Sequence, residues 1–397
     1  MNVTITPSQL FGTVNAIPSK SVAHRILICA ALSNEKTVVH NLFSSKDILA
    51  TKACLSALGC DFEEEFVIPG KKKGSGVLNC CESGSTLRFM LPVALALGGE
   101  FSFEMAGRLP ERPLSPLYEL LQAHGCTLSK QGKNPLKVSG KLMPGIFEIA
   151  GNISSQFITG LLLALPLLES DSEIRIVGEL ESKPYVDITR NVQSLFGIQS
   201  CFKNNTFYVK GNQRYVSPGE ITVEGDWSNA AFWHCADVLS KKQVECIGLN
   251  ENSVQGDKEI VSITHNLPCT VCAKDIPDLI PIIAAVASVT AGQTIITDAK
   301  RLIIKESNRL KTIENVLTAL GADITLTEDG MIINGKESLS GGTVDSFNDH
   351  RIAMMAAIAS IKCKEAITIT NAEAVQKSYP HFWNDFKALG GIIKEEL

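Results

Sequence analysis

Cationic and hydroxyl side chains stand at the start of a stretch that is otherwise apolar. In residues 16–33, AIPSKSVAHRILICAALS, the residues Lys20, Ser21 and Arg25 precede or interrupt a run that is typical of a buried helix. A helix N-terminus already has partial positive charge and unpaired N–H groups, so added cations are unfavourable there unless an anion binds. The stretch therefore predicts an anion-binding site at the start of this helix.

Similar polar groups begin four further apolar stretches of the chain. They are Glu82, Gly84, Ser85 and Arg88 in the second helix, Ser154, Ser155 and Gln156 in the third, Asp278 in the first turn of the fifth, and Asp349, His350 and Arg351 in the sixth. An ordinary N-cap explains each serine or aspartate taken alone. It explains the arginines badly, because their charge opposes the helix dipole.

More cations lie in the connections between these stretches, namely Arg112, Lys305, Arg309 and Lys377. Solvated surface charge would explain any one of them. Taken together they favour a site for two small anions, because guanidinium groups suit carboxylate and phosphate. Asp278 and Glu306 would then form an acid/base pair, in which one carboxylate removes a proton from a hydroxyl group and the other gives a proton to carbon.

These residues belong to a unit that recurs six times along the chain. SKSVAHRILICAALS, for example, is followed by the β-rich KTVVHNL and by a second helical stretch, DILATKACLSALGC. The copies recur at roughly 50 to 70 residues. The first helix of each copy is apolar nearly all round, which favours complete burial, whereas the second is charged on one face. We therefore predict an α/β protein of two similar domains, with three units and buried helices in each.

Composition and missing motifs exclude other classes. There is no G-x-G-x-x-G or Walker A sequence, and eight simple βα units, as in a TIM barrel, are absent. The net charge of -5 and the lack of long like-charge blocks do not favour nucleic-acid binding. No apolar stretch reaches the length of about 18 residues that spans a bilayer, and the N-terminus has no signal-peptide pattern. We expect a cytoplasmic protein that binds neither nucleic acid nor membrane.

The 12 cysteines do not predict a metal site. Most lie inside apolar runs, as Cys29, Cys54 and Cys235 do, and there they act as small hydrophobic residues. Cys269 and Cys272 form a lone C-x-x-C pair, and the remaining ligands that a zinc site needs are not spaced to join it. We expect no metal ligands.

Ten motifs in order along the chain resemble those of the EPSP synthase (3-phosphoshikimate 1-carboxyvinyltransferase) family. They are SKSVAHR, GSTLR, ERP, GNISSQF, SKPYVDIT, VEGDWSNAAF, PDLIP, IKESNRL, FNDHRIAM and QKSYPHF, and they cover essentially the whole length. The resemblance implies an inside-out α/β barrel (EPT/RTPC-like) of six βαβαββ units, three in each of two domains. It assigns residues 13–224 to one domain and residues 1–12 with 225–397 to the other, with the active site in the cleft between them.

The resemblance also implies the reaction. Such an enzyme transfers the enolpyruvyl group of phosphoenolpyruvate (PEP) to the 5-hydroxyl of shikimate 3-phosphate and releases phosphate, a step of chorismate and aromatic amino acid biosynthesis. The reaction passes through a tetrahedral intermediate by addition and elimination, without a metal or organic cofactor. Closure of the two domains would exclude water from the substrates. Family members are commonly monomers, and the same is expected here.

Matching positions imply the roles of individual residues. The shikimate 3-phosphate contacts are Lys20, Ser21, Arg25, Ser154, Ser155, Gln156, Ser182, Asp278 and Lys305. The PEP contacts are Lys20, Gly84, Arg112, Gln156, Arg309, Arg351 and Lys377. Asp278 corresponds to the residue that accepts the 5-hydroxyl proton, Glu306 to the carboxylate that handles the proton at the methylene carbon, and Lys20 to a catalytic residue between the two substrates.

Three positions depart from the common family pattern. The Pro18-Ser19 segment before the first helix is one residue shorter, Glu82-Ser83-Gly84-Ser85 places a carboxylate near the expected PEP site, and Arg301 stands where many members have asparagine.

Two other functions remain open. One is the related transfer of enolpyruvate to UDP-N-acetylglucosamine, but the loop MAGRLPERPLSP lacks the reactive cysteine usual in that enzyme. The other is a non-catalytic anion-binding homologue, which would not need both Asp278 and Glu306.

Overall fold

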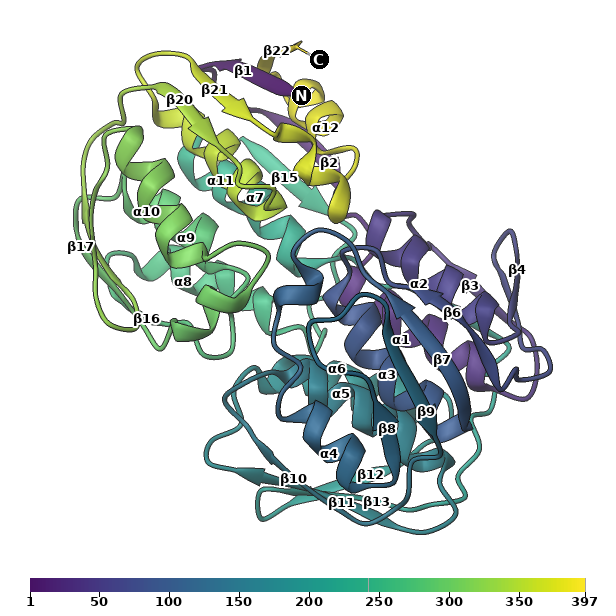
Figure 1. The fold of residues 1–397 in the computed structure, drawn as a ribbon. Helices are drawn as coiled ribbons and strands as arrows, with labels where there is room; N and C mark the ends of the chain where they lie inside the picture. Colours follow the sequence, from purple (N-terminus) through teal and green to yellow (C-terminus); the bar gives the residue numbers. More distant parts are fainter. Residues whose placement is uncertain (242, 397) are drawn as a thin grey trace. The chain divides into compact units, whose positions relative to one another are not determined.

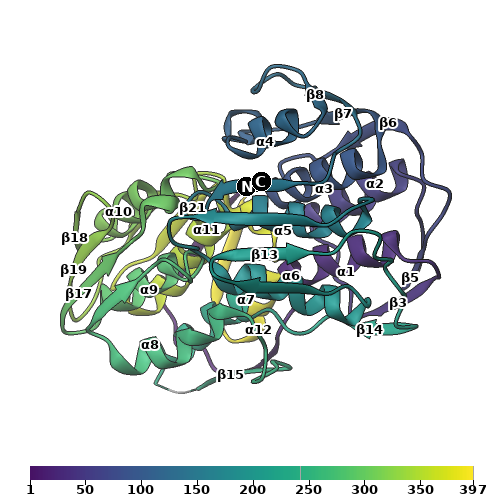
Figure 2. The same ribbon diagram turned by 90° about the horizontal axis from the view of Figure 1, so that it is seen from below.

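Residues 1–241 and 243–396 are described by a computed structural model, in which the chain forms two compact units. One unit contains Pro18–Glu224, and the other contains Met1–Ile17 and Gly225–Leu397. Each has its own hydrophobic core of buried aliphatic and aromatic side chains. We call them the middle unit and the terminal unit, and each is described by itself. Figures 1 and 2 show their elements in two views.

Six buried helices correspond to the six predicted inner helices. In the middle unit they are α1 (Lys20–Leu32), α3 (Gly84–Leu97) and α5 (Ser155–Ala164), and in the terminal unit α7 (Trp227–Leu239), α9 (Ile280–Ala287) and α11 (His350–Ala359). In α9 and α11 every residue is buried, as the apolar composition predicts. In the terminal unit these three helices pack against one another.

The second helix of each copy is also present. These helices are α2 (Lys46–Ala57), α4 (Leu117–Ala123), α6 (Lys183–Leu195), α8 (Ile260–Asn266), α10 (Arg309–Ala319) and α12 (Phe382–Ala388). In the middle unit α6 packs against both α1 and α5, and α5 packs against α3 (Figure 2). These contacts bring the helices that carry predicted site residues into one cluster.

Three four-stranded sheets belong to the middle unit. Their orders are β14 (Glu220–Thr222), β3 (Thr37–His40), β5 (Phe66–Ile68), β4 (Asp61–Glu63); β6 (Ser75–Asn79), β7 (Gly99–Glu104), β9 (Leu136–Gly140), β8 (Cys126–Leu128); and β10 (Ile146–Ala150), β11 (Ser172–Val177), β13 (Thr206–Val209), β12 (Ser200–Lys203). In each sheet the first pair is parallel and the other pairs are antiparallel.

The terminal unit contains two four-stranded sheets and one two-stranded sheet. Their orders are β20 (Gly342–Asp345), β21 (Ile367–Thr370), β1 (Asn2–Thr6), β22 (Ile392–Glu396); β16 (Thr270–Cys272), β17 (Gly292–Thr297), β19 (Met331–Gly335), β18 (Asp323–Leu326); and β15 (Val244–Ile247), β2 (Gly12–Asn15). Figure 1 shows β16 and β17 at the outer edge of this unit, with α9 and α10 on their inner side. The fourth sequence copy thus has a smaller sheet than the other five.

The chain exchanges strands at its two crossings between the units. In four copies the strands before and after the inner helix are parallel neighbours, as a right-handed βαβ connection requires. At the first crossing, however, β2 remains in the terminal unit and pairs with β15, and at the second crossing β14 remains in the middle unit and pairs with β3. Because β1 also pairs with β21 and β22, the N-terminal segment belongs to the terminal unit.

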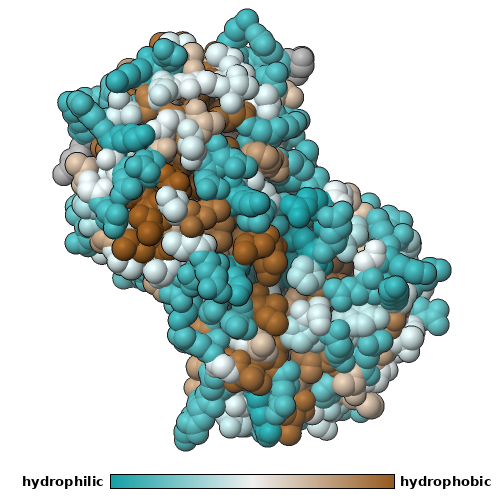
Figure 3. Space-filling view, turned by 60° about the vertical axis from the view of Figure 1, so that its left-hand side comes forward, coloured by the Kyte–Doolittle hydropathy of each residue, from teal (hydrophilic) through white to brown (hydrophobic). Residues whose placement is uncertain are grey.

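The surface is mixed in polarity. Figure 3 shows a face where hydrophilic residues predominate and hydrophobic residues gather in patches. Large apolar side chains with more than half of their area exposed include Phe11, Val77 and Val177, at 60%, 53% and 58%. Among the described residues no helix is long and apolar enough to cross a membrane.

Candidate active site

In the middle unit, the first turn of α1 places Lys20 beside a carboxylate. Ser19 is the N-cap of this helix, and the Nζ of Lys20 lies 2.9 Å from Oδ2 of Asp47 in the first turn of α2. Both side chains keep some exposure, at 19% and 16%. The ammonium group is therefore held in place but remains accessible to a ligand.

Arg25 is a buried cation that contacts only neutral oxygens and an aromatic ring among the described residues. Its Nε donates to Oγ1 of Thr189 at 2.7 Å, Nη1 to the carbonyl of Ser21 at 2.5 Å, and Nη2 to the carbonyl of Tyr185 at 2.9 Å and to Oγ1 of Thr159 at 3.3 Å. Burial lowers the pKa of this guanidinium to about 9. An anion bound nearby would offset the cost of the buried charge.

The start of α5 contributes hydroxyl and amide groups to the same unit. Ser154 is the N-cap, and its Oγ accepts a hydrogen bond from the backbone N–H of Gln156 at 3.3 Å. The side chain of Gln156 then bonds twice to α3, because its Nε2 donates to Ser85 Oγ at 2.9 Å and its Oε1 accepts from Arg88 at 3.2 Å. Ser155 is buried in the first helical turn.

Ser182 takes a conformation that is unusual for a residue with a side chain. It precedes α6 with φ 54° and ψ 37°, in the left-handed region, and is 1% exposed. Strain of this kind persists only where the surrounding structure fixes it, and such positions cluster at ligand sites. The geometry thus agrees with a ligand-contacting role for Ser182.

Gly84 begins α3 directly beneath two guanidinium groups. A Cβ atom at this position would lie 2.5 Å from Nη1 of Arg88 and 2.8 Å from Nη1 of Arg112. Arg88 also donates to the carbonyl of Pro113 at 3.2 Å, so it connects α3 to the loop that carries Arg112. Glycine leaves room for both guanidinium groups in these positions, and a side chain would displace them from this helix start, which is suited to an anion.

The terminal unit contains a cluster in which three cations surround Asp278. Its Oδ1 accepts from Arg309 Nη1 at 2.8 Å and from Lys305 Nζ at 3.3 Å, and its Oδ2 accepts from Arg351 Nη2 at 3.2 Å. Burial alone would raise the pKa of Asp278, but Arg351, Lys305 and Arg309 together hold it well below its usual value. Asp278 is therefore ionised at neutral pH in this structure.

The predicted position of Asp278 within α9 was wrong. The helix begins at Ile280, so Asp278 lies in the turn before it. Pro281 favours a helix start at or just before it, because proline lacks an N–H and fits best in the first turn of a helix. The carboxylate still lies at the N-terminal end of α9.

Arg309 joins both members of the predicted acid/base pair. Besides its contact with Asp278, its Nη2 donates to Glu306 at 2.7 Å and its Nε donates to Asp349 at 2.8 Å. Burial by itself would lower the pKa of Arg309, but Asp349, Glu306 and Asp278 raise it well above its usual value. Glu306 keeps 26% of its side-chain area exposed, so it can reach a ligand.

Arg351 and Lys377 also have contacts with groups other than Asp278 that fix their positions. Nη2 of Arg351 donates to Ser228 Oγ at 2.6 Å, which ties the first turn of α11 to that of α7. Lys377 is 8% exposed, and its Nζ donates to the carbonyl of Asn348 at 2.8 Å. The structure thus brings Asp278, Lys305, Glu306, Arg309 and Arg351 together, with Lys377 anchored beside the start of α11.

Several partners of these residues were not assigned from the sequence. Asp47 pairs with Lys20, Thr159 and Thr189 accept from Arg25, and Asp349 anchors Arg309. From the sequence, Asp349 was placed only at the start of a helix. The structure confirms this position, because Asp349 is the N-cap of α11 and its side chain accepts the backbone N–H of Arg351. Thr159 lies outside the quoted motifs, and Thr189 ends the motif SKPYVDIT without a role assigned to it, so only the packing of α1, α5 and α6 shows their contact with Arg25.

Glu82, whose carboxylate departs from the common family pattern, lies against a loop. A Cβ at Gly107, which has φ 53°, would lie 2.8 Å from Cδ and Oε2 of Glu82, so this side chain packs over the loop after β7.

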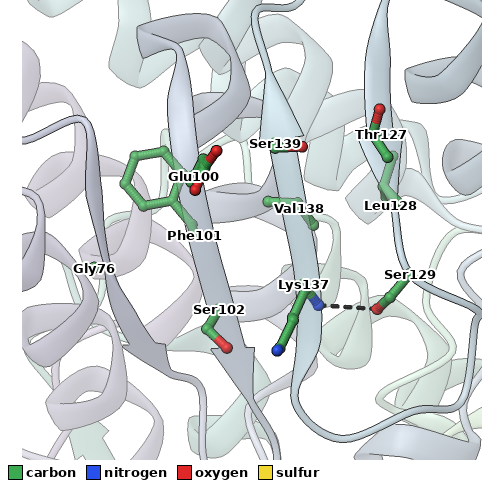
Figure 4. Close-up of a pocket in the computed structure, with 10 residues that line it drawn as sticks. All are labelled: Gly76, Glu100, Phe101, Ser102, Thr127, Leu128, Ser129, Lys137, Val138 and Ser139. Carbon is green, nitrogen blue, oxygen red and sulfur yellow. Dashed lines mark hydrogen bonds between the residues drawn. The ribbon is translucent and has the colours of Figure 1, made fainter.

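A pocket outside these clusters contains no predicted site residue. It has a volume of about 490 Å³ and lies on the sheet of β6, β7, β9 and β8, lined by residues that include Glu100, Ser102 and Lys137 (Figure 4). Ser129 Oγ in this pocket accepts the backbone N–H of Lys137 at 2.9 Å. Its polar groups come from the exposed face of the sheet and do not converge on a common point (Figure 4).

The cysteines are all free thiols, and Cys29, Cys54 and Cys235 are buried as predicted. Among the described residues no group of three or more His, Cys, Asp or Glu side chains could hold a metal ion.

The fold defines the class of the protein. Solved structures with the same fold include EPSP synthase from Acinetobacter baumannii, with a TM-score of 0.81 and 23% identity over 99% of this chain and 100% of that one. The enolpyruvyl transferase NikO from Streptomyces tendae has a TM-score of 0.78 and 15% identity over 99% and 98%. The fold is therefore that of the enolpyruvyl transferases, and the predicted fold class is confirmed.

The sequence identifies the family within this class. The pattern of the family EPSP synthase (3-phosphoshikimate 1-carboxyvinyltransferase) matches residues 5–276 and 264–386. The 3-phosphoshikimate 1-carboxyvinyltransferases of Clostridium kluyveri and Clostridium novyi are each 43% identical, over 99% of this chain and 98% of theirs. That of Clostridioides difficile is 43% identical over 98% of both chains. The chain belongs to the EPSP synthase family, so the family predicted from the motifs is confirmed.

Proposed function

We propose that this protein transfers the enolpyruvyl group of PEP to the 5-hydroxyl of shikimate 3-phosphate and releases phosphate. The observation that carries the proposal is that the guanidinium of Arg309 contacts both Asp278 and Glu306. Addition of a hydroxyl across a carbon–carbon double bond needs one group to remove the hydroxyl proton and one to deliver a proton to the methylene carbon. Membership of the EPSP synthase family supports the same reaction.

Shikimate 3-phosphate would bind at the helix starts of the middle unit. We assign its contacts to Lys20, Ser21, Arg25, Ser154, Ser155, Gln156 and Ser182, with Asp278 and Lys305 from the terminal unit. The support is the buried charge of Arg25, for which the chain supplies no carboxylate among its described residues. The unused N–H of its Nη1 can donate to a substrate oxygen.

PEP would be held by cations of both units. We assign its contacts to Lys20, Gly84, Arg112 and Gln156 in the middle unit and to Arg309, Arg351 and Lys377 in the terminal unit. Its phosphate and carboxylate groups suit guanidinium forks, which can bind two oxygens at once. The placement of the active site in a cleft between the domains, and the function as a cytoplasmic monomer, stay predictions.

Asp278 would act as the base, but in this structure its pKa lies too low for efficient proton removal. Three cations stabilise its charge, so binding of an anionic substrate must draw at least one of them away. Glu306 accepts a hydrogen bond from Arg309 and is more exposed than Asp278, at 26% against 20%. We assign proton transfer at the methylene carbon to Glu306 and assistance in charge stabilisation to Lys20.

A phosphate-release assay on the purified chain tests this function. PEP is offered in parallel reactions with shikimate 3-phosphate and with UDP-N-acetylglucosamine, and release is expected only with the former. Release only with the sugar nucleotide would overturn the substrate, and no release with either would support a non-catalytic homologue.

The role of Arg351 is tested by calorimetry on the Arg351→Ala variant. We expect PEP binding to weaken more than binding of shikimate 3-phosphate, because the guanidinium is assigned to PEP. Arg175→Ala is the matched control, since Arg175 is an exposed arginine paired with Glu173. Equal weakening for both ligands would contradict the assignment.

A further inference from the structure

A chain of buried hydrogen bonds starts at His24, a residue to which no role has been assigned above. Its Nδ1 lies 2.7 Å from Oγ1 of Thr51, which lies 2.7 Å from Oγ1 of Thr86. Thr86 Oγ1 in turn donates to Ser83 Oγ at 2.7 Å. His24 and the three hydroxyl residues are buried, with at most 1% exposure. The chain therefore connects α1 to α2 and α3 through the interior of the middle unit.

The far end of this chain is the start of α3. Ser83 is the N-cap, and its Oγ also accepts the backbone N–H of Thr86 at 3.2 Å. The next residue is Gly84, assigned above to PEP. Thr86 Oγ1 also lies 3.4 Å from the carbonyl of Asp47, the residue whose carboxylate holds Lys20. The chain thus fixes the backbone and side chains on the PEP side of the unit.

The direction of the hydrogen bonds assigns the imidazole tautomer. Because Thr86 donates to Ser83, it accepts from Thr51, and Thr51 then accepts from an N–H on Nδ1 of His24. Burial, together with the charges of Lys20 and Arg25, lowers the pKa of His24 well below its usual value. The ring is therefore neutral, and it supplies one fixed donor to the chain.

Packing alone does not explain this histidine. Its Nε2 is buried and has no hydrogen-bond partner among residues 1–241 and 243–396. An unsatisfied buried polar atom costs about 1–3 kcal/mol, which an apolar side chain would avoid. The feature of the structure that compensates for this cost is the hydrogen-bond chain from His24 to Ser83.

We propose that His24 is a positioning residue for PEP, which sets the N-cap of α3 and hence the Gly84 backbone through Thr51 and Thr86. The proposal rests on the proposed function, because it names the substrate whose site is affected. The expected effect on PEP differs from the effect that the neighbours of His24 in the sequence would suggest. His24 lies next to Arg25 and one turn after Ser21, residues assigned to shikimate 3-phosphate, so a general disturbance of α1 would impair that substrate instead.

Steady-state kinetics with both substrates varied in turn distinguish these outcomes. In His24→Leu we expect KM for PEP to rise about tenfold, the effect of losing about 1.4 kcal/mol from an ordered network, while KM for shikimate 3-phosphate changes less than about twofold. His24→Asn retains a side-chain donor and is expected to restore much of the affinity for PEP.

Two further variants make the test specific. Thr51→Val breaks the same chain away from α1 and should reproduce the selective rise in KM for PEP, even if His24→Leu does not fold. Thr189→Val removes the hydroxyl that accepts from Arg25, and it should instead raise KM for shikimate 3-phosphate. If Thr51→Val raises KM for PEP and Thr189→Val raises KM for shikimate 3-phosphate, the effects come from specific contacts and not from a general loss of structure.

Each outcome bears on one of the two proposals. Equal rises for both substrates, or a rise for shikimate 3-phosphate alone, in His24→Leu and Thr51→Val would overturn the role of His24 and leave the proposed function intact. Failure of the unaltered protein to turn over PEP with shikimate 3-phosphate would overturn the proposed function, and this inference with it.

Discussion

Asp349 is the buried carboxylate that anchors the charged cluster of the terminal unit, and Asp349→Asn tests its role. The residue has no exposed area and accepts hydrogen bonds from Arg309 Nε at 2.8 Å, Ser307 Oγ at 3.0 Å and the backbone N–H of Arg351 at 3.0 Å. Asparagine keeps the size of the side chain and an oxygen for the helix cap. It removes the negative charge that faces Arg309.

The contacts set the expected loss of stability. Removing one partner of a buried ion pair costs about 3–5 kcal/mol, because the other charge remains buried. Arg309 retains Asp278 and Glu306 as partners, and the cap is kept, so we expect about 3 kcal/mol, the lower end. Folded proteins are stable by about 5–15 kcal/mol, so most of the variant should remain folded at 25 °C.

Urea unfolding of the variant and a matched control measures this difference. The control is Glu395→Gln, which breaks the pair of Lys387 and Glu395 at 2.6 Å, where both side chains are more than a third exposed. An exposed pair contributes less than about 1 kcal/mol. Comparing the losses of unfolding free energy in the two variants therefore separates the effect of leaving a buried charge unpaired from the effect of removing a surface charge.

Kinetics provide the second readout for Asp349→Asn. Without its anchor at Nε, the guanidinium of Arg309 should lose its fixed orientation, so KM for PEP should rise. A free energy of unfolding that falls no further than in the control, together with an unchanged KM for PEP, would refute the role of Asp349 as the anchor.

Three other results are expected from the same clusters. Gly84→Ala should raise KM for PEP with little loss of stability, because the new methyl group would displace Arg88 and Arg112; an unchanged KM would contradict the close approach. Asp278→Asn should mainly lower kcat in the phosphate-release assay, and unchanged turnover would remove Asp278 as the base. Because the folded pKa of Asp278 lies below its usual value of 3.8, its contribution to stability is present above that pH and is lost as the pH falls through the folded pKa. The difference in unfolding free energy between Asp278→Asn and the unaltered protein should therefore shrink below about pH 4, and a constant difference would count against this linkage.

The buried helices could be predicted because their signal is local. Apolar residues on all sides of a helix require burial, and α9 and α11 are buried at every residue. The polar residues at their starts could be found for the same reason, since a cation at a helix N-terminus is unfavourable without a ligand. Ligand-binding roles for Arg25 and Arg351 could therefore be predicted from the sequence, and they stay predictions.

The strand exchange and the ion-pair partners depend on distant segments. Nothing in the residues of β2 indicates that it pairs with β15, more than 200 residues away, rather than with β3 after α1. Asp47 likewise resembles an ordinary residue in the first turn of a helix, where a carboxylate is favourable without any ligand. Its pairing with Lys20 follows from the packing of α1 on α2, which sequence patterns do not specify.

The distances around Asp278 indicate how binding of PEP and activation of the base can be coupled. Arg309 is fixed by Asp349 as well as by Asp278, whereas Arg351 reaches Asp278 at the longer distance of 3.2 Å and is otherwise held by Ser228. An anion competing for the cations should therefore take Arg351 more readily than Arg309. Loss of that contact removes the largest of the attractions that lower the pKa of Asp278, while its burial continues to raise it. Binding of PEP would thus prepare the base for the other substrate, because Asp278 becomes a stronger acceptor for the 5-hydroxyl proton of shikimate 3-phosphate when PEP has taken Arg351 from it.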